Sequence, residues 1–305
     1  MSIEFNFPSS DGQTKIYAKK WSPTSKPVGI IQIIHGMAEH INRYNEFAEY
    51  LTSQGWIVIG DDHIGHGKTA NHSQLGYFGN QHPVQNLQQD EITLMHLTKN
   101  DNPSLPYVML GHSMGAMLLQ SILKNISYEI DGAIIIGSSA THPELTPAWP
   151  IIETLNRVSP TKTGHFLDQL SFGSFSKTFN KHVKFSWLTS DSTILKQYED
   201  DPKSGFIFTN NGFFTLMSLT KIATNKHWVD NVRRGCPILI TSGSKDPVGK
   251  FGIGPAYHFN LLINAKFKQV TLKIFENARH EILNETNRPD VYRYLNQWLT
   301  NNLFK

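Results

Sequence analysis

The stretch 111–115, with the sequence GHSMG, holds the residues whose types and spacing most directly indicate chemistry. The apolar run 107–110 before it predicts a buried strand, and the mostly apolar residues 116–123 after it predict a helix. A Gly-x-Ser-x-Gly turn between a strand and a helix is the pattern of a nucleophile elbow. The glycines leave room for a cramped turn that pushes the middle side chain outward. The pattern therefore predicts Ser113 as a nucleophile.

A serine hydroxyl needs a base to take its proton and a carboxylate to orient that base. Asp246 lies in a turn of small residues after the apolar run 238–240, where it would also serve as an ordinary turn residue. His280 follows the apolar run 270–275, where it would also be unremarkable alone. Since all three positions follow predicted strands in the order Ser, Asp, His, we expect them to form a catalytic triad.

The negative oxygen that develops on a substrate carbonyl needs two backbone N–H donors. One is expected from Met114, the residue after the nucleophile. The other is expected from Met37, in the loop HGMAEH at 35–40 that follows the first central strand.

Metal ligation has to be considered because the chain has 14 histidines. The two close pairs are His35 with His40 and His63 with His66, and each lies in a loop that contains glycine. Neither pair has the helical i, i+4 spacing of a zinc protease motif. We therefore expect loop-stabilising hydrogen bonds, with no metal and no cofactor.

The elements that must position these residues show as apolar runs separated by helix-like segments. The runs are continuous rather than alternating, which is typical of strands covered on both faces in a parallel sheet. They lie at 30–34, 56–59, 107–110, 133–136, 238–240 and 270–275, and helices are expected at 41–54, 84–98, 115–125, 252–264 and 288–302. The segment 15–21 alternates and predicts an antiparallel edge strand. The fold class is therefore α/β, with a mostly parallel, doubly wound sheet.

The regular alternation of predicted strands and helices is interrupted by one long segment. About 100 residues separate the strands near 136 and 238, whereas one crossover unit needs about 30. We interpret residues 141–230, which are rich in aromatics, as a mainly helical cap between two parts of the core, 1–140 and 231–305. The cap would form a small core of its own, a lid over the site, or both.

Four lysines are spread among the aromatics of this cap, at Lys162, Lys177, Lys181 and Lys184. They favour a solvated face, with transient contact to an anionic lipid surface as the alternative.

Composition limits the remaining classes of function. The 305 residues carry 28 basic and 25 acidic side chains, a balance that argues against nucleic acid as a partner. We see neither a signal peptide at the start nor an integral membrane segment. With Cys236 as the single cysteine, no intrachain disulfide is available, and we expect a cytoplasmic location. The oligomeric state is left open.

Five motifs together resemble the monoacylglycerol lipase and bacterial lysophospholipase group of α/β-hydrolases, also labelled serine aminopeptidase S33. They are GHSMG at 111–115, HGMAEH at 35–40, DHIGHG at 62–67, GSKDPV at 243–248 and RHEILNE at 279–285. The resemblance implies an α/β-hydrolase fold, with Ser113, Asp246 and His280 as the triad and Met37 and Met114 as oxyanion donors.

The resemblance also implies that Glu39 and Arg43 line the alcohol end of the pocket. One position departs from the pattern, because Leu283 stands where mammalian monoacylglycerol lipases carry a second histidine. We therefore expect a serine hydrolase of lipid-like carboxylic esters, of the monoacylglycerol or lysophospholipid class. The alternatives are other acyl chemistry on the same triad (thioesterase, acyltransferase or aminopeptidase), or a non-catalytic ligand-binding protein on this scaffold.

Overall fold

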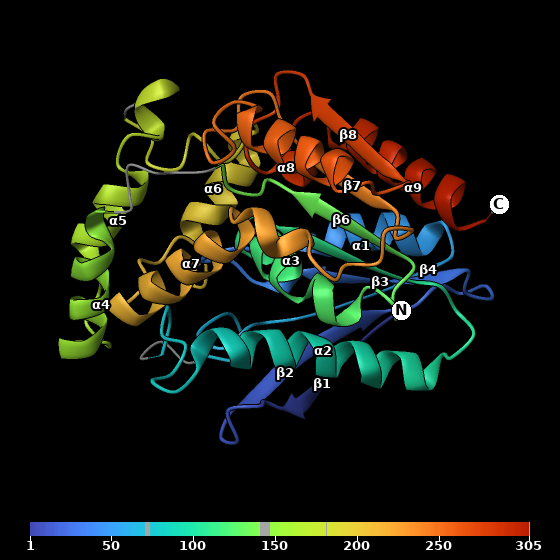
Figure 1. Ribbon diagram of the computed structural model, residues 1–305, viewed down its shortest axis with the longest axis horizontal. Helices are drawn as coiled ribbons and strands as arrows, with labels where there is room; N and C mark the ends of the chain where they lie inside the picture. Colours follow the sequence, from blue (N-terminus) through green and yellow to red (C-terminus); the bar gives the residue numbers. More distant parts are fainter. Residues whose placement is uncertain (71–73, 141–146, 181, 305) are drawn as a thin grey trace.

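Eight strands form one sheet in the computed structural model, which describes residues 1–70, 74–140, 147–180 and 182–304 (Figure 1). The order across the sheet is β1-β2-β4-β3-β5-β6-β7-β8. β2 pairs antiparallel with β1 and β4, and all the other pairs are parallel. The strands are β1 Ser2–Pro8, β2 Lys15–Trp21, β3 Gly29–Ile34, β4 Trp56–Asp61, β5 Tyr107–His112, β6 Gly132–Ile136, β7 Ile238–Gly243 and β8 Val270–Phe275. The predicted, mostly parallel α/β sheet is confirmed.

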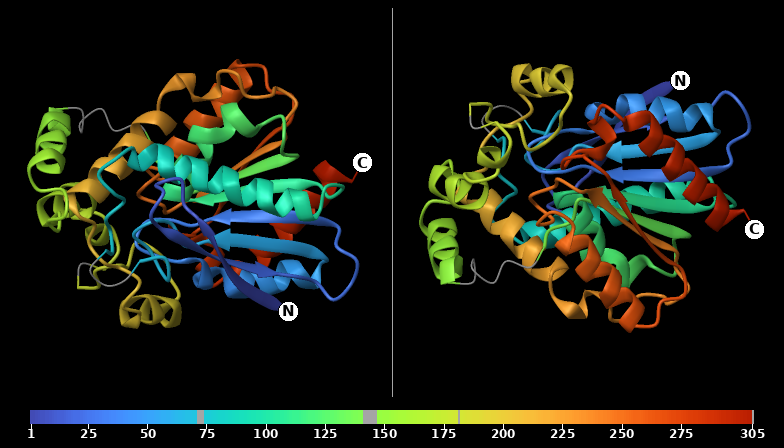
Figure 2. Two further views of the ribbon diagram at one scale, coloured as in Figure 1. Left: turned by 90° about the horizontal axis from the view of Figure 1, so that it is seen from below. Right: turned by 90° about the horizontal axis from the view of Figure 1, so that it is seen from above.

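Helices cover both faces of this sheet (Figure 2). α1 Asn45–Ser53 and α9 Arg288–Leu303 pack on one face, and α2 Pro83–Asp101, α3 Met114–Ile126 and α8 Ile253–Asn264 pack on the other. Neighbouring strand residues serve opposite faces: Ile30 belongs to the buried cluster of α3, and Ile31 to that of α1 and α9. Because both faces are buried, the strands read as unbroken apolar runs.

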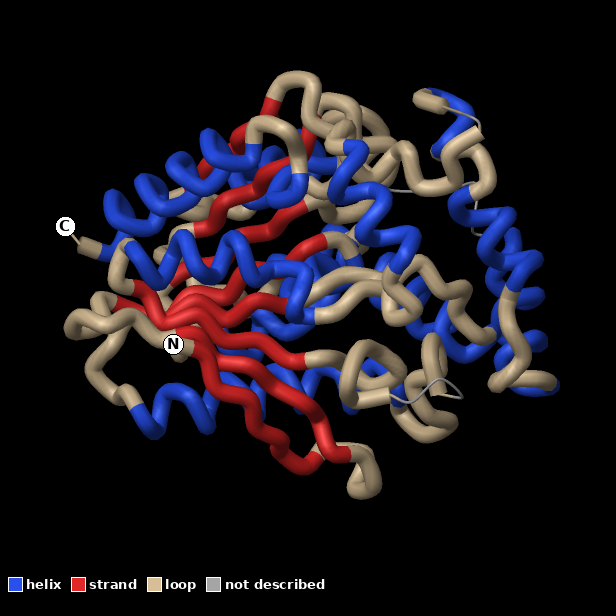
Figure 3. The backbone as a smooth tube through the Cα atoms, turned by 180° about the vertical axis from the view of Figure 1, so that it is seen from behind, coloured by secondary structure: helices blue, strands red, loops and turns tan. Residues whose placement is uncertain are grey.

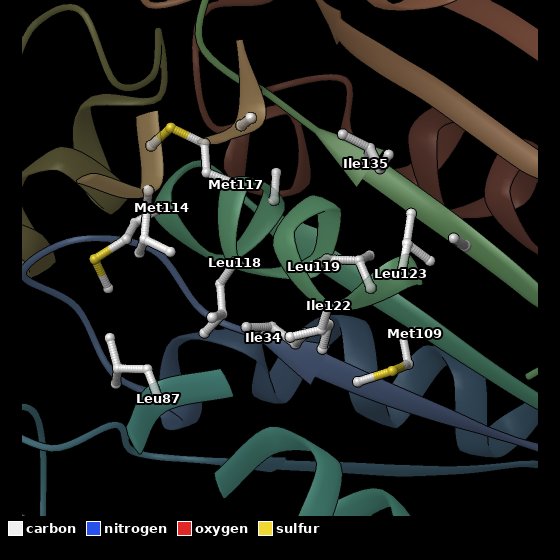
Figure 4. Close-up of a cluster of buried hydrophobic side chains, with 14 of the residues drawn as sticks. Ile34, Leu87, Met109, Met114, Met117, Leu118, Leu119, Ile122, Leu123 and Ile135 are labelled. Carbon is white, nitrogen blue, oxygen red and sulfur yellow. The ribbon is translucent and has the colours of Figure 1, made fainter. Parts of the chain in front are cut away.

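The helix that follows Ser113 is buried over most of its length, with 11 of its 13 residues buried. In Figure 4, Leu118, Leu119 and Ile122 of α3 lie among side chains of the strands, including Ile34 and Ile135. All of these side chains are fully buried. Close packing on every side leaves α3 little freedom to move, so the residue at its start has a fixed position.

Among the described residues between β6 and β7, four α-helices lie beyond the carboxyl ends of the parallel strands (Figure 3). They are α4 Trp149–Val158, α5 His165–Phe172, α6 Ser192–Asp200 and α7 Asn210–Ala223. α7 packs against α3 and shares its buried cluster, so this part of the insertion is continuous with the main core. The expected start of the cap, 141–146, and Lys181 lie outside the described residues, and the division of the chain at 140 and 230 stays a prediction.

Short 3-10 helices complete the described elements, namely η1 Ile41–Tyr44, η3 Ser176–Thr178, η4 Lys226–Val229 and η5 Ile282–Asn284. The sequence reasoning missed β1, an edge strand next to β2 in which Ile3, Phe5 and Phe7 alternate with polar residues and form no unbroken apolar run. No helix in the described part of the chain is both long and apolar enough to cross a lipid bilayer.

Candidate active site

Ser113 occupies the tight turn between β5 and α3. Its backbone has φ +54° and ψ −116°, a strained combination for a residue with a side chain. A Cβ atom added at Gly111 would lie 2.3 Å from the carbonyl oxygen of Gly115, and one added at Gly115 would lie 2.0 Å from that of Ile34. Both glycines are therefore required by the close approach of backbone, as the elbow pattern predicts.

His280 and Asp246 form a buried pair at the same end of the sheet. The Nδ1 atom of His280 lies 2.9 Å from Oδ1 of Asp246. The carboxylate also accepts hydrogen bonds of 2.9 Å from the N–H of Val248 and from the hydroxyl of Ser242. A carboxylate on Nδ1 holds the imidazole in the tautomer whose Nε2 can take a proton.

The end of β6 connects the elbow to this pair. The N–H of Ser113 donates to the carbonyl oxygen of Ile136 at 2.9 Å. The next residue, Gly137, has φ +63°, and a Cβ added there would lie 3.1 Å from Cε1 of His280 and 3.5 Å from Oδ2 of Asp246. The structure thus brings the three predicted triad residues to one edge of the sheet.

Ser113 and His280 also line one cavity. The hydroxyl of Ser113 makes no hydrogen bond within the described part of the chain. Catalytic hydrogen bonds are often long before substrate binds, so the shared cavity is the relevant geometry.

The two expected oxyanion donors belong to the two segments next to Ser113, since a Cβ added at Gly36, the residue before Met37, would lie 3.2 Å from Cβ of Ser113. Met37 lines the cavity from the loop after β3, and Met114 begins α3. Neither backbone N–H has a hydrogen-bond partner among the residues that the structure describes. The start of α3 adds a partial positive charge where an oxyanion would form.

The cavity beside Ser113 has a volume of about 1030 Å³. Apolar side chains from α3, from α7 and from the inserted segment line part of it, including Met117, Phe172, Trp187, Leu216 and Met217. The ring of Trp187 lies 5.2 Å from that of His280. The volume is at the upper end of ordinary ligand pockets, and the lining suits a hydrocarbon chain.

The structure places Glu39 on the cavity wall, whereas Arg43 is not among the residues that line it. Arg43 donates to Oε2 of Glu39 at 2.6 Å and to both carboxylate oxygens of Glu281 at 2.7 and 2.6 Å. Burial by itself would raise the pKa of Glu39, but Arg43 and His112 hold that pKa well below its usual value. Arg43 likewise keeps the pKa of Glu281 lowered against the effect of burial.

Two cavity residues near the triad were missed in the sequence reasoning. Glu281 lines the cavity directly after His280, and His112 lines it directly before Ser113. The Nδ1 atom of His112 contacts Glu39 at 3.2 Å, while its buried Nε2 has no partner in the described residues. The sequence could have indicated both residues, because each is next to a predicted triad residue in the chain. Leu283, at the departure from the family pattern, is buried and does not line the cavity.

The histidines considered for metal binding make hydrogen bonds in buried loops. His66 accepts from the N–H of Ala38 at 3.2 Å, and His40 lies 2.6 Å from Asp201. The rings of His35 and His63 stack with their centres 3.8 Å apart.

His63 also belongs to a buried cluster that the sequence reasoning did not find. Its Nδ1 lies 3.2 Å from Glu91 and 3.5 Å from Asp61, and the donor atoms of the three residues, which could hold a metal ion, all lie within 4.8 Å of one another. Burial and the neighbouring Asp61 raise the pKa of Glu91 to about 8. Because Glu91 keeps its proton at neutral pH, it adds no negative charge to the cluster.

Comparison with known proteins gives consistent matches. The protein-family model described as "Serine aminopeptidase, S33" matches residues 25–287. A monoglyceride lipase homolog of monkeypox virus is 28% identical over 290 residues, which are 94% of each chain. The monoglyceride lipase of Homo sapiens is 25% identical over 305 residues, covering 96% of this chain and 88% of that one.

A solved structure is similar over nearly the whole chain. It is that of a thermostable carboxyl esterase from Bacillus coagulans in complex with glycerol, with a TM-score of 0.90 and 28% identity. The similarity covers 99% of this chain and 98% of that one.

Proposed function

Because the chain belongs to the serine aminopeptidase S33 family, with an α/β-hydrolase fold, we propose that it hydrolyses carboxylic esters of lipid-like substrates through an acyl-enzyme on Ser113. The observation that carries the proposal is the meeting of a strained elbow serine and a buried carboxylate–imidazole pair at one cavity. Relatives named monoglyceride lipase and carboxyl esterase support ester hydrolysis.

In the first half-reaction, Nε2 of His280 takes the proton of Ser113 while Oγ attacks the ester carbonyl. The N–H groups of Met37 and Met114 stabilise the negative oxygen of the tetrahedral intermediate. The carbon–oxygen bond to the alcohol then breaks, and His280 gives its proton to the departing alcohol. The acyl group remains on Oγ.

In the second half-reaction, His280 takes a proton from water, which attacks the acyl carbonyl. The bond to Oγ breaks, and the proton returns to Ser113 as the acid leaves. Asp246 orients the imidazole and stabilises its positive form in both halves. These steps balance with water as the only co-reactant.

The substrate class follows from the cavity lining. Its apolar side chains suit the acyl chain, and its volume of about 1030 Å³ holds a substrate larger than a simple short ester. Phe166 and Leu170, four residues apart on α5, are 59% and 44% exposed, and Leu170 also lines the cavity. We propose that this face of α5 makes transient contact with a lipid surface.

We also propose a cytoplasmic location. Cys236 is buried and unpaired, and burial raises the pKa of its thiol to about 11. A thiol of this kind is a structural side chain suited to a reducing compartment.

The test compares Ser113→Ala with the wild-type protein on p-nitrophenyl esters and on monoacylglycerols and lysophospholipids of graded chain length. We expect the substitution to abolish turnover without changing thermal unfolding. Ser121→Ala, in the same helix but away from the cavity, is the matched control and should retain activity. Wild-type turnover in Ser113→Ala would refute the proposal. A thioester or aminoacyl amide cleaved faster than every ester would favour one of the other acyl chemistries.

A further inference from the structure

The motif DHIGHG at 62–67 has no part in the proposed reaction, yet two of its side chains bind the loop that follows β3. Oδ1 of Asp62 accepts a hydrogen bond of 2.8 Å from the N–H of Ile41, and Nε2 of His66 accepts one of 3.2 Å from the N–H of Ala38. Asp62 and His66 are both fully buried. Neither lines the cavity, so they can affect a bound substrate only through this loop.

The N–H of Met37 and the carbonyl oxygen of Gly36 belong to one peptide unit. That oxygen accepts a hydrogen bond of 2.8 Å from Nδ1 of His35. Nε2 of the same ring accepts one of 3.1 Å from the backbone N–H of His63, which lies in the motif. Because the carbonyl and the N–H of a trans peptide point in opposite directions, this contact directs the N–H of Met37 away from the imidazole.

The next residue, Ala38, has a backbone conformation that is uncommon for a residue with a side chain, with φ +51°. Its N–H donates to His66, and its carbonyl oxygen accepts from the N–H of Gly205 at 2.9 Å and from the hydroxyl of Tyr198 at 3.1 Å. Such a conformation persists only where its surroundings hold it. His66 holds the peptide unit next to that of the Met37 N–H, whereas the two bonds to the carbonyl oxygen hold the unit after that.

The ring of His66 is itself held in one state. Its Nδ1 donates to the carbonyl oxygen of Ile64 at 3.1 Å, which leaves Nε2 as the acceptor nitrogen of a neutral imidazole. Burial lowers the pKa of His66 to about 3, so the ring stays neutral at neutral pH. The rings of Phe78 and Phe208 both lie 5.3 Å from it, centre to centre. The nitrogen that faces Ala38 is therefore a fixed acceptor.

We propose that His66 and Asp62 are positioning residues of the oxyanion site: they hold the loop after β3 so that the N–H of Met37 stays directed at the negative oxygen of the intermediate. The inference rests on the proposed ester hydrolysis and refines it. A backbone donor helps the reaction only while its direction is fixed, since a displacement of about 1 Å costs up to about a hundredfold in rate. Gly67 serves the same arrangement, because a Cβ there would lie 2.0 Å from Oδ2 of Asp62.

The experiment compares two amide side chains at position 66. In His66→Gln the amide reaches the place of Nε2 and can still accept from the N–H of Ala38. In His66→Asn the shorter amide reaches only the place of Nδ1, so it can contact Ile64 but not Ala38. Steady-state kinetics with p-nitrophenyl octanoate give kcat and KM for each protein.

The same proteins are tested for inhibition by 1,1,1-trifluoro-2-decanone. Oγ of Ser113 adds reversibly to the carbonyl carbon of this ketone while the serine proton passes to His280. The former carbonyl oxygen then carries the negative charge in the place where the oxyanion of the reaction would form. The inhibition constant Ki therefore reports on the oxyanion donors, and a loss of fold stability alone does not change it.

We expect His66→Asn to lower kcat by about tenfold to a hundredfold with little change in KM, and to raise Ki for the ketone by a similar factor. His66→Gln should stay close to the wild-type protein in both. Ser127→Ala is the matched control, because the buried hydroxyl of Ser127 accepts a hydrogen bond of 2.9 Å from the backbone N–H of Arg233, just beyond the end of α3 away from Ser113. It should lower the free energy of unfolding and leave kcat and Ki unchanged.

A second measurement needs no variant. Amide hydrogen exchange in the wild-type protein, followed by NMR, should be slow at Ala38 in the free protein, because its N–H is already bonded to His66. At Met37 the exchange should slow further once the ketone has added to Ser113, because the new oxyanion accepts from that N–H.

Wild-type kcat and Ki in His66→Asn would overturn this inference. An equal loss in both amide variants would also overturn it, since the packing of the ring and not the bond to Ala38 would then matter. Fast exchange at Ala38 in the wild-type protein overturns it whether or not the variants fold. In all three cases the wild-type protein still cleaves the ester, so ester hydrolysis stands. A wild-type protein that cleaves neither octanoyl esters nor monoacylglycerols would instead refute the proposed function.

Discussion

A buried carboxylate lies beside an imidazole in several places in the described part of the chain, and two of these places differ sharply in their setting. At the carboxyl edge of the sheet, Asp246 holds Nδ1 of His280 at 2.9 Å, and His280 also lines a large cavity together with Ser113. At the end of β4, His63 lies 3.2 Å from Glu91 and 3.5 Å from Asp61, and none of the three lines that cavity.

The difference lies in what surrounds each pair. The carboxylate of Asp246 accepts hydrogen bonds of 2.9 Å from Val248 and Ser242 as well as from His280, so the imidazole is held in one orientation. Both oxygens of Asp61 lack a hydrogen-bond partner in the described residues, and a retained proton on Glu91 balances the charge. A carboxylate and an imidazole therefore act as a general base only where a nucleophile and an open cavity lie beside the imidazole.

Replacing the two histidines should give the largest contrast. His280→Gln removes the proposed base and should lower kcat by about 10⁴-fold or more, with little change in thermal unfolding. His63→Gln removes the positive partner of buried carboxylates, and should lower the free energy of unfolding by about 3–5 kcal/mol while the folded protein stays active. Steady-state kinetics and urea unfolding of both variants check this. Equal losses of turnover in the two would contradict the distinction.

Replacing the two carboxylates should also lower kcat in one region and not in the other, with a smaller difference than for the histidines. Asp246→Asn keeps the shape but no longer holds the Nε2 tautomer, and should lower kcat by about 10³- to 10⁴-fold. Asp61→Asn should leave kcat nearly unchanged, because Asp61 lies away from the cavity. The measurement is kcat on one ester at saturating concentration, and a large loss in Asp61→Asn would show that the two regions are coupled.

Two glycines with positive φ provide a finer test of how His280 is positioned. Gly137→Ala would place a methyl group 3.1 Å from the imidazole, and should lower kcat by about tenfold to a hundredfold through misplacement of the base. Gly12 has φ +73° with open space around it, so Gly12→Ala should cost about 1 kcal/mol of stability without affecting kcat. The assay is kcat beside the free energy of unfolding for each variant. If Gly137→Ala and Gly12→Ala both lower the free energy of unfolding and neither lowers kcat, the close packing of Gly137 against His280 is not needed for activity.

The cluster of Asp61, His63 and Glu91 should make the stability of the protein depend on pH. Substituting Glu91 should change this dependence with almost no effect on turnover. The pKa of Glu91 is raised from 4.5 to about 8 on folding, so the folded state binds the extra proton between these values. Its contribution to stability is fully present below pH 4.5 and is lost as pH rises toward about 8. Glu91→Gln cannot ionise and should flatten the fall in unfolding midpoint over this range. An unchanged pH profile would contradict the raised pKa.

Much of the fold was predictable from the sequence because its elements have local causes. The central strands are unbroken apolar runs, such as 30–34 and 133–136, since both faces of the sheet are covered. β1 was missed, because it is an edge strand whose apolar residues Ile3, Phe5 and Phe7 alternate with polar ones and so form no unbroken run. The elbow and the turns that hold Asp246 and His280 were visible as short motifs.

What escaped prediction depends on contacts between distant residues. Arg43 and Glu281 are 238 positions apart, and no local spacing indicates that they pair. The cluster of Asp61, His63 and Glu91 joins the end of β4 to α2 in the same way. Such pairs become visible only once the chain is folded, and they decide which charged side chains remain available to a substrate.

Covalent labelling with a fluorophosphonate tests whether Ser113 is the nucleophile. The native protein should gain one adduct, mapped to Ser113 by tandem mass spectrometry. The adduct should be absent in Ser113→Ala and strongly reduced in His280→Gln, but retained in His63→Gln. An adduct on another residue, or ester hydrolysis by a protein that gains none, would show that Ser113 is not the nucleophile.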